Sequence, residues 1–444
     1  MMGKFLNTIA YNLLDIWDIN RILQDNEYED MVPLSSLLTQ YQKIISKQEA
    51  IAKHLFIISK ISFAGVLHLN DFEKIYSVKG TLYEIPIGAI TYSKINVRHG
   101  CSYLNNTNNS ILASSEYPSF IIDENKVYPK YLIMVLRCPQ ILKQFNSKLR
   151  GFTKSRVGVS EFLLTKIPLP SLEKQKELVA EYEKLQNLAT QKEEDAKKIE
   201  NSIDEYLLSE LGVKNVSSLR NERNLFKVIQ YNALNKWEID RIYQLEAKYP
   251  IVSFGNNPNI VQSIKRGKSP HYSEQSNCLA INQKCVRKQY IDMTYAKKIE
   301  QIWCDEIDTE YKTKEDDILI NSTGEGTIGR AAIVNKETNY IYDSHILNVR
   351  LNKEECFPHY FLRLFNTELL QKQVDLYKSG TSTKQTELGV DNLKKISFPL
   401  PSMEIQRSII MEIENKEKQI IILRNESEQL KQQAVSNFEQ EVFN

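Results

Sequence analysis

The segment that decides the fold reads Ile167-Pro168-Leu169-Pro170-Ser171-Leu172-Glu173-Lys174-Gln175, and it returns as Phe398-Pro399-Leu400-Pro401-Ser402-Met403-Glu404-Ile405-Gln406. The two copies are 231 residues apart (398 − 167), and Gly158-Val159 returns as Gly389-Val390 at the same offset. Each copy places prolines and a serine ahead of a glutamate, which is typical of the start of a helix. The chain is therefore expected to consist of two similar halves, each ending in a helix.

A second repeat marks the start of each half. Residues 11–22 read Tyr-Asn-Leu-Leu-Asp-Ile-Trp-Asp-Ile-Asn-Arg-Ile, and residues 231–242 read Tyr-Asn-Ala-Leu-Asn-Lys-Trp-Glu-Ile-Asp-Arg-Ile. The offset is here 220 (231 − 11), so the halves share their ends and differ in the length and sequence of their middles. Two matches in the same order indicate a duplication.

The segments after the two Pro-Leu-Pro-Ser motifs carry apolar residues at alternating spacings of four and three, which is the heptad pattern of a coiled coil. Lys192 interrupts the first pattern, and Lys416 and Ser427 interrupt the second. Each helix has about 40 residues and a length of roughly 60 Å. We expect the two seams to pair with each other; the alternative is that each helix packs on its own half. The pairing residues are predicted to be Leu178, Tyr182, Leu185, Ile199 and Ile203 in the first helix and Ile409, Ile413, Ile420, Leu423 and Leu430 in the second.

These patterns predict an α+β fold with an internal pseudo-two-fold repeat. Two mixed α/β globes are expected to be separated by two long antiparallel coiled-coil helices. The predicted boundaries are 1–165 for the first globe, 166–214 for the first helix, 215–396 for the second globe and 397–444 for the second helix.

Signatures of several enzyme classes are absent from the sequence. It has no G-x-x-x-x-G-K-[ST] phosphate loop, no H-E-x-x-H zinc motif and no N-P-P-[YF] motif of DNA amino-methyltransferases. Gly324-Glu325-Gly326-Thr327-Ile328-Gly329 matches G-x-G-x-x-G, but a dinucleotide site needs a helix after this motif. Residues 330–335 read as a strand, so we interpret the glycines as a loop between two strands. The sequence therefore predicts a protein without catalytic residues or bound metal.

Composition limits the class of protein further. The formal net charge of +1 excludes a strongly basic protein that coats DNA without preference. The six cysteines form no C-x-x-C pair, and we expect them to be free thiols in a reducing cytoplasm.

The most apolar stretch, 55–69, is shorter than a membrane span and contains Lys60, and no signal peptide is visible at the start. We expect a cytoplasmic protein that does not contact a membrane.

Charge is distributed unevenly along the chain. Residues 125–160 contain eight basic residues and no acidic residue, and residues 247–291 contain seven basic residues and one acidic residue, Glu274. Residues 171–210 carry eleven acidic and six basic residues, a net of −5 (6 − 11). A basic segment in each half favours contact with DNA phosphates, although one such segment by itself is more often a solvated surface.

Side chains that suit base edges or phosphates lie in and near these segments, because Arg pairs with guanine and Asn or Gln with adenine. The candidate DNA contacts are Ser93, Lys94, Asn96, Arg98, Lys148, Arg150 and Lys154 in the first half and Lys265, Arg266, Lys268, Asn282, Lys284, Thr381, Thr383 and Lys384 in the second.

The chain resembles the specificity subunit of type I restriction-modification systems over nearly its whole length. The resemblance rests on the duplicated Pro-Leu-Pro-Ser segments, on Trp17 and Trp237, and on the run from Asp316-Asp317-Ile318-Leu319 to Gly326-Thr327-Ile328-Gly329-Arg330-Ala331. It implies two target-recognition domains that each read one part of a split site in double-stranded DNA. It also implies helices that dock two methyltransferase subunits, with restriction and translocase subunits joining through them.

The resemblance implies that the chain is non-catalytic and has no cofactor of its own. S-adenosylmethionine, ATP and magnesium are expected on the partner subunits. The competing interpretations are a self-contained DNA methyltransferase or nuclease with an unfamiliar active site, and a purely structural coiled-coil scaffold. The basic segments in both halves argue against a scaffold.

Overall fold

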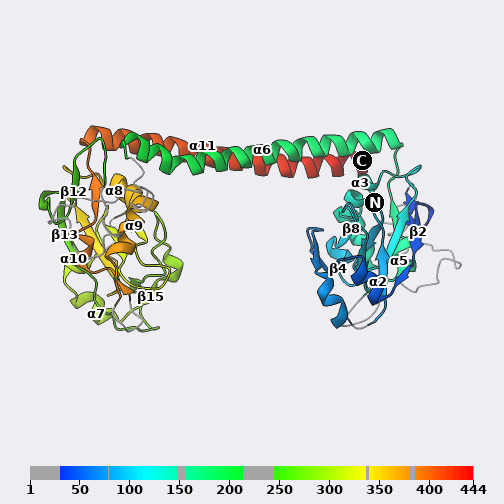
Figure 1. The fold of residues 1–444 in the computed structure, drawn as a ribbon, viewed down its shortest axis with the longest axis horizontal. Coiled ribbons are helices and arrows are strands. Elements are labelled where there is room, and N and C mark those ends of the chain that lie inside the picture. The colour runs from blue at the N-terminus through cyan, green and yellow to red at the C-terminus, as the bar shows by residue number, and fades with distance from the viewer. Residues whose placement is uncertain are drawn as a thin grey trace, which may run out of the picture. The chain divides into compact units, whose positions relative to one another are not determined.

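The computed structural model describes residues 31–78, 80–147, 156–213, 245–336, 340–380 and 386–443. Trp17, Trp237 and the repeat that contains them lie outside the described residues. The chain divides into two compact units, the first formed by residues 1–192 with 425–444 and the second by residues 193–424. Each unit combines one globe with parts of two long helices (Figure 1).

The first globe contains a four-stranded antiparallel sheet in the order β2-β10-β7-β8, a five-stranded sheet in the order β3-β6-β9-β4-β5, and the pair β1-β11. Its strands are β1 (Val32–Pro33), β2 (Leu38–Tyr41), β3 (Ile44–Ile45), β4 (Ile57–Ile61), β5 (Leu67–Asn70), β6 (Leu82–Ile85), β7 (Ile90–Tyr92), β8 (Ser102–Leu104), β9 (Ile111–Ala113), β10 (Ser119–Ile122) and β11 (Lys166–Ile167). Its helices are α2 (Lys47–Ala52), α3 (Pro129–Val135), α4 (Pro139–Ser147) and α5 (Val159–Leu163).

The core of the first globe joins the four-stranded sheet to the helices that follow it in the chain. Tyr92 and Phe120 come from the sheet, Phe145 from α4 and Phe162 from α5. The ring centroids of Tyr92 and Phe162 are 4.0 Å apart, and those of Phe145 and Phe162 are 5.7 Å apart. Burial of these large apolar side chains holds α4 and α5 to the sheet.

The second globe repeats this plan with a smaller second sheet. Its sheets have the orders β13-β19-β16-β17 and β15-β14-β18, with the pairs β12-β22 and β20-β21. Its strands are β12 (Ile251–Ser253), β13 (Val261–Arg266), β14 (Leu279–Ile281), β15 (Lys297–Lys298), β16 (Ile318–Asn321), β17 (Ala331–Ile333), β18 (Ile341–Tyr342), β19 (Ile346–Leu351), β20 (Ser379–Gly380), β21 (Thr386–Glu387) and β22 (Ser397–Pro399). Its helices are α7 (Gln301–Glu306), α8 (Pro358–Phe365), α9 (Glu368–Tyr377) and α10 (Val390–Leu393).

The two four-stranded sheets correspond strand by strand, since β2, β7, β8 and β10 take the same places as β13, β16, β17 and β19. The second sheets differ, with five strands in the first globe and three in the second. Single short 3-10 turns complete the connections at Leu34–Ser36, Phe72–Ser77, Val97–His99, Pro258–Ile260, Met293–Tyr295 and Thr309–Tyr311. The halves therefore share a frame and differ in what is built onto it, as the repeat predicts.

The long helices are α6 (Leu172–Glu210) and α11 (Met403–Phe443), and they are antiparallel within each unit. In the first unit the start of α6 lies beside the end of α11, where Lys174 Nζ is 3.2 Å from Glu441 Oε2. In the second unit Arg424 Nη2 donates to Glu200 Oε2 at 2.7 Å. The strands β11 and β22 belong to the globes, although they lie within the residues assigned from sequence to the helical spacers. The predicted fold class, mixed α/β globes with antiparallel long helices, is confirmed.

The three polar residues that interrupt the heptad seams all contact the other helix. Lys192 Nζ lies 2.7 Å from Glu426 Oε2, and Lys416 Nζ lies 5.4 Å from the centre of the Tyr206 ring. Ser427 is buried, and its hydroxyl donates to the Ala189 carbonyl at 2.8 Å. These residues thus join the helices rather than breaking the seam.

The predicted pairing residues lie on the packed side of the helices. Leu178, Ile203, Ile409, Ile413 and Ile420 are buried. The other members of the set are half-buried: Tyr182, Leu185, Ile199, Leu423 and Leu430.

The helices also pack on the globes. In the first unit the ring of Phe438 from α11 lies 6.0 Å from that of Tyr131 from α3. The end of the second helix thus packs on the first globe, and the alternative in which each helix packs only on its own half is wrong. No helix within the described ranges is long and apolar enough to cross a membrane.

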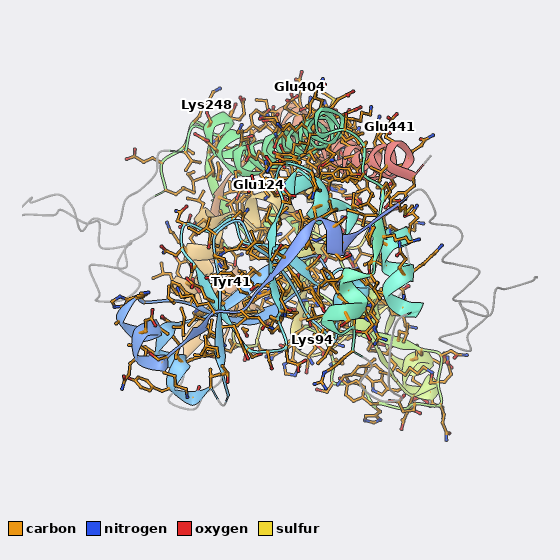
Figure 2. The ribbon with its side chains drawn as sticks, turned by 90° about the vertical axis from the view of Figure 1, so that its right-hand side faces the viewer. Tyr41, Lys94, Glu124, Lys248, Glu404 and Glu441 are labelled. Atoms are coloured by element: carbon orange, nitrogen blue, oxygen red, sulfur yellow. A yellow bond between two sulfur atoms is a disulfide. The ribbon has the colours of Figure 1, made fainter. Side chains whose placement is uncertain are left out.

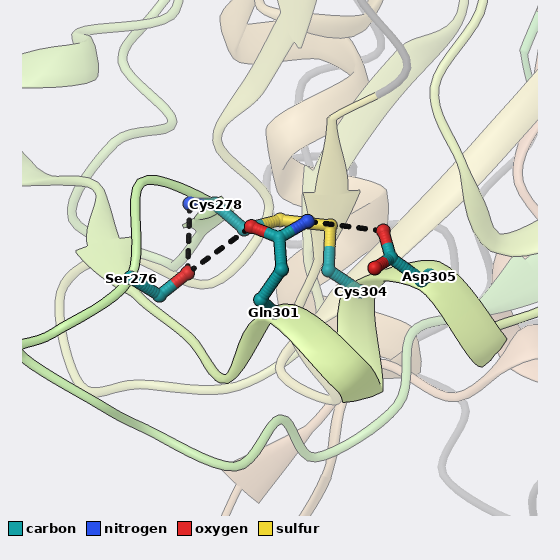
Figure 3. The surroundings of a disulfide bond; sticks show 5 residues. All are labelled: Ser276, Cys278, Gln301, Cys304 and Asp305. Carbon is teal, nitrogen blue, oxygen red and sulfur yellow. Dashed lines mark hydrogen bonds between the residues drawn. A yellow bond between two sulfur atoms is a disulfide. The ribbon is translucent and has the colours of Figure 1, made fainter.

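The expectation of six free thiols is wrong, because Cys278 and Cys304 form a disulfide (Figure 3). Cys278 lies just before β14, and Cys304 lies on α7. Beside the disulfide, Ser276 Oγ accepts from Cys278 N at 3.0 Å, and Gln301 Nε2 donates to Asp305 Oδ1 at 3.0 Å. The two cysteines are 26 residues apart and match no short motif, so only the packing of α7 beside β14 brings them together. The remaining cysteines are free and buried: Cys101, Cys138, Cys285 and Cys356.

Candidate nucleic-acid interface

The two globes present the same loop between corresponding strands. Nine residues, 93–101, join β7 to β8, and nine residues, 322–330, join β16 to β17. The offset is 229 at the first residue (322 − 93) and at the penultimate glycine (329 − 100). Gly100 and Gly329 both have a φ of 80°, a left-handed conformation that glycine adopts without strain. The loops are therefore equivalent, and they differ in the side chains they carry.

The first of these loops holds four of the predicted DNA contacts. Ser93 is buried, and its hydroxyl accepts from Asn96 N at 3.3 Å, so it closes the turn. Arg98 Nε donates to His99 Nε2 at 3.1 Å. Lys94 is fixed through its backbone, which donates to Glu116 O at 3.1 Å and accepts from Val157 N at 2.8 Å. Lys94, Asn96 and Arg98 are all half-exposed.

Lys94 lies in the part of the first globe that is away from Glu441 of α11 (Figure 2). It lines a cavity of about 100 Å³ together with Gln40, Tyr41 and Tyr117. The other basic candidates of this globe, Lys148, Arg150 and Lys154, lie outside the described residues.

The basic residues predicted at the end of β13 have partners within the second globe. Lys265 forms an ion pair with Glu310, and this hydrogen bond lowers the pKa of the Glu310 carboxyl. Arg266 forms an ion pair with Glu387 and donates from Nε to Ser344 O at 2.6 Å. Lys268 is exposed, with its ammonium 4.6 Å from the centre of the Tyr311 ring. Of these three, Lys268 is the most available to a phosphate.

Asn282 is buried and its side chain is used inside the globe. Its Nδ2 donates to Tyr295 O at 2.6 Å, and its Oδ1 accepts from Lys284 N at 2.8 Å. This arrangement favours a role in holding the turn over contact with a base. Lys284 is exposed beside it. Thr381, Thr383 and Lys384 lie outside the described residues, between β20 and β21.

None of the DNA contacts predicted from sequence lies in the second loop, 322–330. The structure confirms that its glycines form a loop between two strands, because β17 and not a helix follows. The loop borders a polar groove with a volume of about 740 Å³, which Arg266 and Glu387 also line. Gln283 and His345 face the same groove. The equivalence of Ser93 with Ser322 and of Gly100 with Gly329, at a constant offset, was the sequence signal that could have found it.

Two interactions connect His345, which lines this groove, to the start of loop 322–330. Thr323 Oγ1 lies 2.7 Å from His345 Nδ1, and Ser322 Oγ donates to His345 O at 3.1 Å. Asp343 lies nearby and is buried, which raises the pKa of its carboxyl. Among the described residues, no group of three or more His, Cys, Asp or Glu side chains is placed to hold a metal ion. The groove therefore offers hydrogen-bond donors and acceptors in a fixed arrangement.

The comparisons with known proteins agree with this architecture. The family model for the type I restriction modification DNA specificity domain matches twice, at residues 42–201 and 248–432. No curated protein matches the chain.

Two solved structures share its fold. One, from work on complex assembly and conformational transition of the type I R-M system, has a TM-score of 0.57 at 15% identity and covers 93% of this chain and 95% of that chain. The other, the HsdS subunit from Thermoanaerobacter tengcongensis, has a TM-score of 0.52 at 15% identity and covers 93% of this chain and 96% of that chain. With most of its length matched by the family model, the chain belongs to the type I restriction modification DNA specificity family.

Proposed function

We propose that this chain gives a type I restriction-modification complex its DNA specificity in two parts, with each globe reading one part of a split sequence. DNA recognition is the role of the family to which the chain belongs. The observation that carries the two-part proposal is the pair of equivalent frames with different second sheets, five-stranded in one globe and three-stranded in the other. The equivalent four-stranded sheets would let both globes dock on DNA in the same way, and the different second sheets would let them read different base sequences.

The distribution of charge supports contact with DNA by both globes. Lys94 and Arg98 lie on the loop of the first globe, and Lys268 and Lys284 are at least half-exposed on the second. Attraction between such side chains and phosphates is independent of sequence, and it positions a protein whose other side chains read base edges.

We further propose that the long helices dock two methyltransferase subunits, through which restriction and translocase subunits join. Among the described residues, one large apolar side chain is exposed on α6 and four are exposed on α11, and contiguous exposed apolar surface is typical of interaction sites. These side chains are Leu188 on α6 and Met411, Ile421, Ile422 and Val435 on α11. S-adenosylmethionine, ATP and magnesium would then belong to the partner subunits.

We propose finally that the chain itself is non-catalytic and acts in the cytoplasm. The absence of the sequence signatures of methyltransferases and nucleases supports the first point. Purified chain, free of other subunits, is expected to transfer no methyl group and to cleave no DNA. Activity that a single substitution in this chain abolishes would overturn the proposal.

The test of two-part reading is an exchange of the second globe. Residues 245–395 are replaced with the same region of another family member, and the methylated sequences of a host that carries the complex are determined. One part of the methylated site is expected to change and the other to stay the same. The reciprocal exchange of the first globe is the matched control. A change in both parts, in a complex that still assembles, would contradict independent reading.

A further inference from the structure

We propose that Gln283 is a specificity-determining residue of the second globe, and that the groove beside loop 322–330 reads an adenine through its side-chain amide. The inference rests on the proposed function and adds to it a residue, a surface and a base. Gln283 follows β14, and it shares the groove with Thr323, Glu325 and His345.

The side chain of Gln283 keeps hydrogen-bonding capacity unused, while its backbone is tied to the neighbouring strand. Its Oε1 is buried and has no hydrogen-bond partner among the described residues. The backbone carbonyl of Gln283 accepts from Asn321 Nδ2 at 2.9 Å, which ties the residue to the end of β16. A buried acceptor without a partner is costly, so a ligand that supplies a donor is favoured.

Gly324 creates the space that this amide occupies. It has a φ of 103°, and a Cβ at this position would lie 2.4 Å from Gln283 Oε1. Glycine adopts this φ without strain, and a side chain at this position would push the Gln283 amide aside. Loop 322–330 and Gln283 form one surface, although they are distant in sequence.

The electrostatics of the groove suit a base edge better than a phosphate. The Arg and Lys side chains that line the groove are both paired: Arg266 forms an ion pair with Glu387, and Lys378 Nζ lies 2.6 Å from Asp375 Oδ1. Base edges are neutral and present hydrogen-bond donors and acceptors, whereas phosphates need unpaired positive charge. The exposed side chains of Lys268 and Lys284 lie outside the lining of the groove and suit the phosphates.

The chemistry of a carboxamide selects the base. A glutamine presents a donor and an acceptor together, and this pair matches N7 and the N6 amino group of adenine in the major groove. Replacing Gln283 with glutamate removes the donor and leaves acceptors alone. That change disfavours adenine and favours the N4 amino group of cytosine.

The test is selection of bound sequences from a library of randomised DNA duplexes with the full chain. The wild-type protein is expected to select a two-part sequence. For Gln283→Glu, preference for adenine at one position is expected to fall by about 5- to 150-fold, in the part assigned to the second globe by globe exchange. The rest of the motif should remain. Gln275→Glu makes the same chemical change at an exposed glutamine of the same globe and is expected to leave every position unchanged.

Gln283→Ala removes the amide without adding charge and is expected to relax the same position to several bases. An unchanged motif for either Gln283 variant overturns the proposal and leaves two-part reading intact. Loss of all binding by both variants, at an unchanged unfolding temperature, also overturns it, since a base contact affects one position. If a free mononucleotide binds the protein and does not displace bound DNA, the groove is the site of another ligand and the proposal is overturned. Failure of the wild-type protein to select any sequence would instead reject the proposed function.

Discussion

Gln175 and Gln406 make the same three hydrogen bonds in the two halves of the chain. Gln175 Oε1 accepts from Tyr128 N at 2.7 Å, and its Nε2 donates to Lys126 O at 3.2 Å and Pro170 O at 2.8 Å. Gln406 Oε1 accepts from Phe357 N at 2.7 Å, and its Nε2 donates to Glu355 O at 3.2 Å and Pro401 O at 2.9 Å. Both side chains are fully buried. Each glutamine therefore fastens the first turn of a long helix to the segment that opens a helix of its globe.

Gln406→Leu is expected to lower the free energy of unfolding of the second unit by about 2–5 kcal/mol. The substitution keeps the volume of the side chain but leaves the Phe357 N–H and the carbonyls of Glu355 and Pro401 without this partner. A buried polar group that stays without a hydrogen bond costs roughly 1–3 kcal/mol. Denaturant unfolding followed by circular dichroism measures the loss. Gln433→Leu, at an exposed position of the same helix, is the control and should change stability by less than about 0.5 kcal/mol. Equal effects of the two substitutions would contradict the role of the buried amide.

Asp317→Ala is expected to destabilise the second globe by about 3–5 kcal/mol, because it leaves a charged partner unpaired. The buried Asp317 carboxylate accepts from Arg350 Nε and Nη2, both at 2.7 Å, and from Asn348 Nδ2 at 2.8 Å. The hydrogen bonds that Arg350 donates to the Asp317 carboxylate raise the pKa of the Arg350 guanidinium. Calorimetric unfolding checks the loss, with the exposed Glu315→Ala as the neutral control. A change below about 1 kcal/mol for Asp317→Ala would rule out a structural role for this pair.

Asp343→Asn is expected to stabilise the protein at pH 7.5 and to lose that advantage as the pH falls. Burial raises the pKa of Asp343 above that of the unfolded chain, so its favourable contribution exists only at low pH and is lost as the pH rises through the folded pKa. Asparagine keeps an acceptor for His345 N, which lies 3.0 Å from Asp343 Oδ1, and removes the charge. Urea unfolding of both proteins at pH 4 and pH 7.5 gives the comparison. A difference in stability that is the same at both pH values would show that the charge of Asp343 is not the cause.

The free cysteines are expected to resist alkylation in the folded protein. Burial raises the pKa of Cys138 and of Cys356 to about 12, and burial also raises the pKa of Cys101 and Cys285. The thiolate is the nucleophile, so almost none is present at pH 7.5. Peptide mapping after treatment with iodoacetamide should find these four thiols unmodified, and the same treatment in denaturant should modify all four. Rapid labelling of any of them in the folded protein would contradict its placement in the core.

Lys268→Ala is expected to weaken binding to all DNA sequences alike and to flatten the salt dependence by about one unit, as for loss of one phosphate contact. The side chain is exposed beside Tyr311 and does not line the groove of the second globe. Titrations at several salt concentrations measure the slope. Lys431→Ala, an exposed lysine on α11, tests whether loss of any positive charge has this effect. An effect of Lys268→Ala confined to one sequence would instead make Lys268 a base contact.

The heptad seams and the shared frames could be predicted from sequence because periodicity and repetition are properties of the chain order. The ion-pair partners of the candidate DNA contacts could not be predicted from sequence. Lys265 and Glu310 are 45 residues apart, and Arg266 and Glu387 are 121 residues apart. A basic side chain looks equally available in a sequence whether or not an acid lies beside it in space. For the same reason the sequence does not show that the Asn282 amide donates to Tyr295 O.

By itself, the sequence determined that the chain is a duplicated α+β protein with two long helices, since a repeat of Pro-Leu-Pro-Ser and an apolar residue at every third or fourth position have few other solutions. Only the tertiary structure decided that the end of α11 packs on the first globe, that Cys278 meets Cys304, and that Gln283 shares a groove with loop 322–330. Each of these is a contact between segments distant in sequence. Such contacts depend on how sheets and helices fill space together, and local pattern carries no record of that packing.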